Sequence, residues 1–345
     1  MSSVMHRAGA LVSTFVQLRV GREDVSAGIR ICVTLFAACT LVAVFQRPDL
    51  TIFAVFGVFP VMFGRGYPGR RGRAAAELRA AVMVASGVLL GAFLNAAGTH
   101  PAELVLWETF FCAGACLYTF KIRSTPPGPF FGLFAFGATA SAPTQAGTSG
   151  PVIVFVLAAT AAILGGMLLR PETRVDNKGG GQARCRSAAW TSLISHVCAV
   201  TLAGLLAQRV GAQHGYWAMA SAVVPLSAVG FTGIVGRGLH RMLGTAAGVL
   251  LAIPVFAVLQ APVALMAAIA LMMFPTEMYM RRNYALALAF FTPLILAMTA
   301  LVDLSGTDGG QLFLDRSVQT LMGAIVGLGV GVAAELALPR RMPGA

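Results

Sequence analysis

Long apolar stretches separated by short polar loops run through almost the whole sequence. Residues 152–169 and 243–259, for example, form nearly continuous apolar stretches. The bilayer core contains no water, so a spanning chain must satisfy its backbone internally, as helices or as a closed barrel. Barrel strands alternate apolar and polar positions over about ten residues, and these stretches do not. The pattern therefore predicts an all-α, polytopic membrane protein.

The same pattern predicts about twelve transmembrane helices. A spanning helix needs about 20 residues, with a range of about 17–25. The second and fifth segments are shorter, so each is expected to be a broken or re-entrant helix. The predicted spans are residues 29–46, 50–64, 78–97, 103–120, 129–142, 150–169, 190–208, 215–235, 242–260, 262–280, 283–302 and 316–338.

Basic residues test this count independently, because Lys and Arg concentrate in cytoplasmic loops. With a cytoplasmic N-terminus, all but three of the 25 Lys and Arg residues fall on the cytoplasmic side, the exceptions being Arg47, Arg209 and Arg316. A wrong number of spans would place Lys and Arg residues on both sides of the membrane. The charge distribution therefore predicts a multi-pass protein of the cytoplasmic membrane with both termini in the cytoplasm.

The chain also repeats weakly. The run Gly-Val-Leu-Leu occurs at residues 87–90 in the third span and again at 248–251 in the ninth. A basic pair follows the fourth span at Lys121 and Arg123, and another follows the tenth at Arg281 and Arg282. An even number of spans gives each half the same orientation, as in transporters built from parallel repeats. We therefore expect two parallel six-helix repeats.

These features divide the chain into five predicted parts. The first is a cytoplasmic segment with an amphipathic helix at residues 3–19, where apolar residues follow helical spacing. A polar linker with three consecutive glycines separates the repeats. The parts are residues 1–27 for the N-terminal segment, 28–170 for the first repeat, 171–189 for the cytoplasmic linker, 190–338 for the second repeat and 339–345 for the cytoplasmic tail.

Ionisable groups inside apolar spans are costly, so each is a candidate functional residue. Glu108 and Glu277 are the acidic candidates, because a partly desolvated carboxylate can titrate near neutral pH and couple transport to protons. The alternative for Glu277 is a helical ion pair with Arg281, four residues on. His196 is a candidate proton relay, with a hydrogen-bonded core histidine as its alternative.

Helix breakers recur at the second and fifth spans of both halves: Pro60, Gly137, Pro225 and Pro293. Interrupted spans at matching positions indicate a binding site, because unwound backbone offers polar groups at mid-membrane. The alternative is that these are ordinary kinks, which membrane helices tolerate. We predict a site between the halves at mid-membrane, where these breaks meet.

The second half contains a set of recognisable motifs. Tyr-Trp opens the eighth span, and Arg-x-x-Gly-Thr-x-x-Gly opens the ninth. Two further pieces are an Arg-Asn-Tyr segment and an arginine at the start of the last span. The positions are Tyr216, Trp217, Arg241, Gly244, Thr245, Asn283, Tyr284 and Arg316. Together these motifs resemble the fusaric acid resistance family of membrane proteins.

This resemblance implies a secondary exporter of small organic anions, particularly aromatic carboxylates, with most of those positions contacting the substrate. Arg241 would bind a carboxylate, with a purely topogenic charge as its alternative, and Arg316 would either bind an anion or pair with Asp315. Tyr216 and Trp217 would either stack on an aromatic substrate or anchor the helix at the interface. The first half lacks these motifs, so the resemblance covers about residues 190–338.

Composition narrows the alternatives. Charged residues make up 11% of the chain, against about 25% in soluble proteins. The net charge of +12 is spread over short loops, so nucleic acid is not expected as a partner. An organic-anion channel on the same scaffold stays open. A lipid-modifying enzyme is less favoured, because the five His residues are scattered. No cofactor or metal is predicted; the partners are the anion and membrane lipid, and a homo-oligomer stays open.

Overall fold

The computed structural model describes residues 18–65, 67, 69–124, 127–142, 149–168, 186–302 and 309–337. Over these ranges the chain forms helices and no strands. The predicted amphipathic helix at 3–19 and the linker at 171–189 lie almost wholly outside the described residues, and the tail at 339–345 lies wholly outside them.

Nine helices in the described part of the chain are long and apolar enough to cross a membrane. They are α2 (Arg22–Val44), α4 (Gly69–Ala96), α5 (Pro101–Lys121), α7 (Ser149–Leu168), α8 (Arg186–Arg209), α10 (Phe231–Val258), α11 (Pro262–Tyr279), α12 (Tyr284–Val302) and α13 (Gly309–Ala337). Three shorter apolar segments lie between them. They are η1–α3–η2 (Pro48–Leu50, Thr51–Val58 and Phe59–Gly64), α6 (Phe130–Ala140) and α9 (Tyr216–Leu226). The prediction of an all-α polytopic protein is confirmed.

The predicted eighth and ninth spans had wrong boundaries. Residues 215–235 do not form one helix, because α9 ends at Leu226 and α10 begins at Phe231. Between them Gly230 has a φ of 76°, a left-handed conformation that glycine adopts without steric cost and that breaks a helix. Residues 231–235, predicted as the end of the eighth span, and residues 236–241, predicted as a loop, therefore form the start of one 28-residue helix. This shift moves Arg241 from a predicted cytoplasmic loop into a membrane helix.

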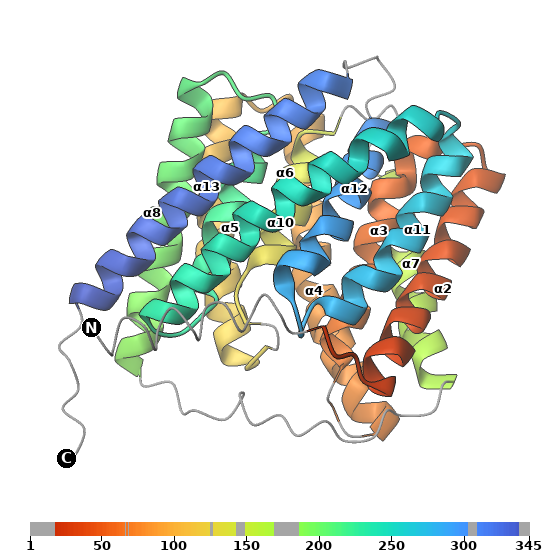
Figure 1. The fold of residues 1–345 in the computed structure, drawn as a ribbon, viewed down its shortest axis with the longest axis horizontal. Coiled ribbons are helices and arrows are strands. Elements are labelled where there is room, and N and C mark those ends of the chain that lie inside the picture. The colour runs from red at the N-terminus through yellow and green to blue at the C-terminus, as the bar shows by residue number, and fades with distance from the viewer. Residues whose placement is uncertain are drawn as a thin grey trace.

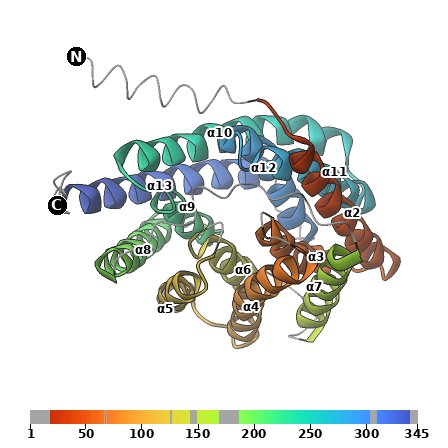
Figure 2. The ribbon, with the colours of Figure 1, turned by 90° about the horizontal axis from the view of Figure 1, so that it is seen from below.

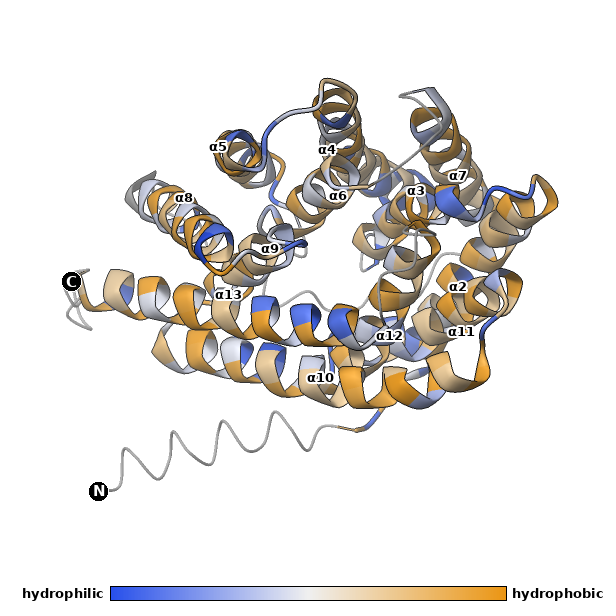
Figure 3. Cartoon of the chain, turned by 90° about the horizontal axis from the view of Figure 1, so that it is seen from above, coloured by the Kyte–Doolittle hydropathy of each residue, from blue (hydrophilic) through white to orange (hydrophobic). Residues whose placement is uncertain are grey.

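The short helices lie inside a ring of long ones. Figure 1 shows the long helices from the side, and Figure 2, seen along them, shows α3, α6 and α9 surrounded by the others. Every residue of α3 is buried, and so are the ten residues of α6 after Phe130. The outer helices consist largely of hydrophobic residues (Figure 3), and apolar side chains on them such as Leu89, Phe110 and Leu250 are exposed. An apolar outer surface of this kind suits contact with lipid tails.

The two halves of the chain pack against each other through equivalent pairs of helices. Helix α2 packs on α11 of the other half, and α8 packs on α5. Within each half, α4 packs on α6 and α10 packs on α12. The matched glycines sit at these contacts: Gly87 meets the backbone of α6 at Gly132, and Gly248 meets α12 at Thr292. The two Gly-Val-Leu-Leu runs therefore have equivalent packing roles.

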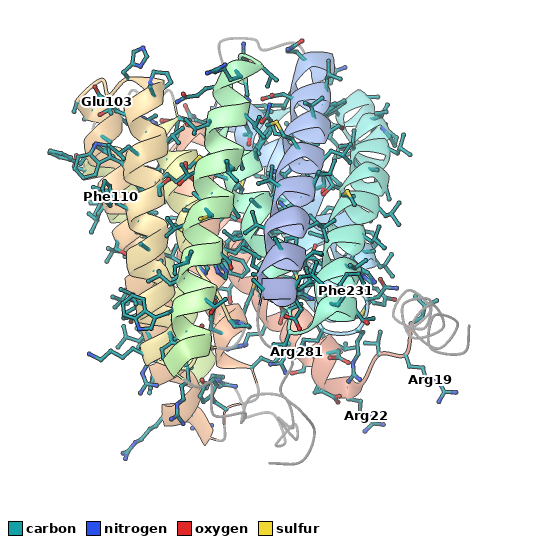
Figure 4. All side chains as sticks on the ribbon, turned by 90° about the vertical axis from the view of Figure 1, so that its left-hand side faces the viewer. Arg19, Arg22, Glu103, Phe110, Phe231 and Arg281 are labelled. Carbon is teal, nitrogen blue, oxygen red and sulfur yellow. The ribbon has the colours of Figure 1, made fainter. Side chains whose placement is uncertain are left out.

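Opposite ends of the bundle carry different parts of the chain. Glu103, in the first turn of α5, lies at one end in Figure 4. The labelled Arg22 at the start of α2, Phe231 at the start of α10 and Arg281 after α11 lie at the other end. Helices α5 and α11 thus run from the end with Glu103 toward the opposite end, and α2 and α10 run the other way.

Candidate anion-binding site

Arg241 lies within α10 and is 1% exposed. Its Nη2 donates a hydrogen bond to the hydroxyl of Ser221 on α9, at 3.0 Å. Its guanidinium carbon is 5.3 Å from the centre of the Phe130 ring, at the start of α6. The Nε and Nη1 groups have no hydrogen-bond partner. Arg241 therefore points into the interior, where Ser221 and Tyr284 are its polar neighbours.

Arg316 lies within α13 and is also 1% exposed. Its guanidinium carbon is 5.0 Å from the ring centre of Trp217, a cation–π contact. Helix α13 approaches α9 closely, because Gly323 and Gly327 pack directly on the carbonyl groups of Ala218 and Ala222. The Nε and Nη1 of Arg316 likewise have no hydrogen-bond partner.

The two arginines contact the same short helix one turn apart. Trp217, beside Arg316, and Ser221, beside Arg241, are four residues apart on α9 and so share a face, about 6 Å apart along the axis. The positive charges of the two side chains lie near enough to repel each other. The structure thus brings together two residues separated by 75 positions that the sequence placed near opposite membrane faces.

The nearest acid in the sequence does not neutralise this pair. The carboxylate of Asp315 binds His214 instead, with Oδ2 2.7 Å from Nδ1 and 3.2 Å from the backbone nitrogen. Within the ranges that the structure describes, no carboxylate forms an ion pair with Arg241 or Arg316. Burying a cation without a partner is costly in free energy. This arrangement therefore favours the binding of an anion beside the two arginines.

Further polar groups surround the arginines. The Tyr284 hydroxyl faces Arg241. Thr245 follows Arg241 by one turn on α10, and Gln319 and Thr320 follow Arg316 by one turn on α13. The side-chain oxygens of these three residues are buried and have no hydrogen-bond partner. The site therefore offers both charge and uncharged hydrogen-bonding groups to a ligand.

Aromatic rings form one wall of the site. Trp217 stacks on His214, with ring centres 4.4 Å apart and planes 14° apart. Tyr216 packs on Phe134 of the first half, with centres 5.9 Å apart. Both Tyr216 and Trp217 are buried, so their rings face the protein interior rather than its outer surface.

The predicted helix breaks are distributed around the interior. Gly137 of α6 lies against Tyr216, where a larger side chain would collide with the tyrosine. Phe59, which precedes Pro60, packs on Phe291 of α12, two residues before Pro293, with ring centres 5.8 Å apart. Pro225 lies in the last turn of α9, about two turns from Trp217. Gly137 therefore lies beside Tyr216, next to Trp217 of the arginine site, and Pro225 lies one turn beyond Ser221.

Glu108 borders the same region from α5. It is 3% exposed, and its Oε1 has no hydrogen-bond partner. The carboxylate lies against Gly137, beside Tyr216. Its titratable neighbours are Tyr216 and Cys112, the latter one turn along α5.

The remaining predicted residues lie elsewhere. Glu277 sits 3.5 Å from Arg65 in a buried ion-pair cluster that also contains Asp24 and Arg282. His196 contacts the carbonyl oxygen of Ser192 on its own helix, 2.7 Å from Nδ1. Asn283 caps α12, where its Oδ1 accepts a hydrogen bond from the backbone of Leu286. None of these contacts involves the two arginines.

Four residues of the site were missed by reasoning from the sequence: Phe130, Ser221, Gln319 and Thr320. Three of them follow a recognised residue at helical spacing, Ser221 after Trp217 and the other two after Arg316. That spacing places them on the same helix face and was the available signal. Phe130 belongs to the other half of the chain and had no such signal.

The arginine site lies within a segment that matches a known family. Residues 201–330 match the family model described as fusaric acid resistance protein-like. The resemblance predicted from the motifs is confirmed there, and the segment contains Trp217, Ser221, Arg241 and Arg316. No curated protein and no solved structure matches the chain.

Proposed function

We propose that this protein is a secondary transporter that exports small organic anions across the cytoplasmic membrane. The observation that carries the proposal is the pair of buried arginines, each with unpaired N–H groups and without a carboxylate partner. A bound anion would satisfy these groups and offset their charge. Both arginines lie in the segment that matches the fusaric acid resistance protein-like family, and this match supports a role in membrane transport.

Aromatic carboxylates are the proposed substrates. A guanidinium group binds a carboxylate through two parallel hydrogen bonds, and the rings of Trp217 and Phe130 lie beside the two guanidinium groups. The charged end of an aromatic acid would therefore bind between the arginines while its ring packs on this wall. Tyr284, Thr245 and Gln319 would bind substituents on the ring.

The proposed architecture is twelve membrane segments in two parallel six-helix repeats. The reciprocal packing of α2 on α11 and α8 on α5 supports it, since exchanging the halves converts one contact into the other. The site lies where the halves meet, because Phe130 comes from the first and the arginines from the second. Movement of one half against the other would then open the site to alternate sides.

Reconstitution into liposomes tests this function. The probe is labelled benzenesulfonate, an aromatic anion that stays ionised at every pH used and does not leak through lipid. We expect saturable uptake that aromatic carboxylates compete with and that an imposed pH gradient stimulates. Unitary currents in a planar bilayer would indicate the channel alternative instead, and the absence of any protein-dependent flux would contradict both.

Proton coupling is proposed to run through Glu108. An ionised carboxylate without a partner is costly in an apolar interior, so this side chain is suited to pick up and release a proton beside the substrate. We expect Glu108→Gln, which cannot ionise, to take up benzenesulfonate without stimulation by the pH gradient. The matched control is Glu103→Gln, at the exposed start of the same helix, which should respond like the parent. Full stimulation in Glu108→Gln would rule out this route.

A further inference from the structure

A groove opens on the outer surface between α10 and α13, which lie side by side and run in opposite directions (Figure 1). It encloses about 150 Å³, and its lining includes Met242, Thr245, Ala246, Val318, Thr320 and Leu321. Ala246, Val318 and Leu321 are exposed at its mouth, whereas the two threonines are buried at its floor. The mouth is therefore apolar and faces the region expected to hold lipid tails.

The floor of the groove lies between the two arginines. Gly238 of α10 packs on Leu328 of α13, which defines a common level. With a rise of 1.5 Å per residue, Thr245 lies about 10 Å beyond that level and Thr320 about 12 Å beyond it. Arg241 lies at about 4 Å and Arg316 at about 18 Å on the same scale. The groove thus reaches the interior at a height between the backbone positions of the two arginines.

The threonine hydroxyls point to a ligand at this floor. Thr245 and Thr320 are 2% and 1% exposed, and neither hydroxyl has a hydrogen-bond partner. A threonine inside a helix can bond the carbonyl four residues back, as Thr276 and Thr299 do here. Two unpaired hydroxyls at the bottom of one groove indicate that a polar group belongs there.

We propose that this groove is a second subsite, entered sideways from the bilayer, which holds the apolar tail of an amphiphilic organic anion. The charged group of that anion lies at the floor, between Arg241 and Arg316. This proposal rests on the proposed function and extends its substrate class to anions that partition into lipid. Charge complementarity selects this occupant, because the apolar mouth accepts the tail while the buried cations behind it require a negative end.

The test compares benzenesulfonate with 4-pentylbenzenesulfonate, which differs only by the tail. In the reconstituted parent protein, we expect the pentyl compound to inhibit uptake of labelled benzenesulfonate at least tenfold more strongly than unlabelled benzenesulfonate does. The Ala246→Trp variant fills the mouth of the groove, so the ratio of the two inhibition constants should fall to about one. The control is Ala247→Trp, on the next exposed position outside the groove, which should keep the parental ratio.

Equilibrium dialysis of labelled 4-pentylbenzenesulfonate with purified protein separates the two hypotheses. Absence of transport together with Ala246-dependent binding would overturn the proposed function and keep the groove as a subsite. A ratio of inhibition constants near one in the parent protein would overturn the groove proposal while leaving the function in place. The same ratio in both tryptophan variants would do so too. That second result is also the one expected if a phospholipid chain, or another copy of the protein, occupies the groove.

Discussion

Replacing either buried arginine is expected to abolish anion transport. Arg316→Gln and Arg241→Gln each remove one of the two positive charges that the proposed substrate would contact. Both arginines are only 1% exposed. Removing one partner of a buried ion pair costs about 3–5 kcal/mol, which corresponds to a loss of roughly 100-fold or more in affinity. We therefore expect uptake of benzenesulfonate at low concentration to fall at least about 100-fold.

Two further variants make this prediction specific. Arg316→Lys keeps the charge and loses the planar two-nitrogen fork, so it should retain only part of the activity. Arg209→Gln removes an exposed basic residue at the end of α8 and should leave uptake unchanged. Size-exclusion chromatography in detergent checks that each variant is folded. Parental uptake by both glutamine variants would place the anion site elsewhere.

The second large effect is expected on stability. Glu77 of α4 is fully buried and lies 2.6 Å from Arg30 of α2, which is also buried. The second guanidinium nitrogen of Arg30 donates to the carbonyl oxygen of Val61, so this pair joins α4, α2 and η2. Glu77→Gln leaves the arginine charge buried without its counter-charge, and we expect a loss of about 3–5 kcal/mol of unfolding free energy.

An exposed pair in the same half provides the matched control. Arg47 and Asp49 are 2.7 Å apart, but the arginine side chain is 42% exposed. Ion pairs that water reaches contribute about 0–1 kcal/mol, so Asp49→Asn should be nearly neutral. Thermal unfolding in detergent measures both variants. Equal melting temperatures for the two would show that the buried pair does not stabilise the fold.

The described part of the fold followed largely from the sequence. Each predicted apolar segment apart from the eighth and ninth, whose boundaries were wrong, coincides with a helix or short helical stretch of the structure. The shortness of the second and fifth segments was also foreseen, because the number of consecutive apolar residues limits helix length. The motifs around Trp217 and Arg241 indicated the family, which the match over residues 201–330 bears out.

The burial of Arg241 did not follow from the sequence. Arg237, His240 and Arg241 lie together among glycines, a pattern typical of a cytoplasmic loop. Helix α10 continues through them, because its glycines let it pack closely: Gly244 on Ala285 and Gly238 on Leu328. Whether a basic residue faces water or the interior depends on these long-range contacts, and local composition does not contain them.

The sequence by itself determined which segments are helical and membrane-like, and which residue types can bind an anion. Only the tertiary structure decided which of those residues meet. Glu277 pairs with Arg65, 212 positions away, rather than joining the site. Arg241 and Arg316 share a site because both contact α9. The physical reason is that hydrophobic periodicity specifies which face of a helix is buried, while the partner that covers that face is chosen by close packing among all the helices.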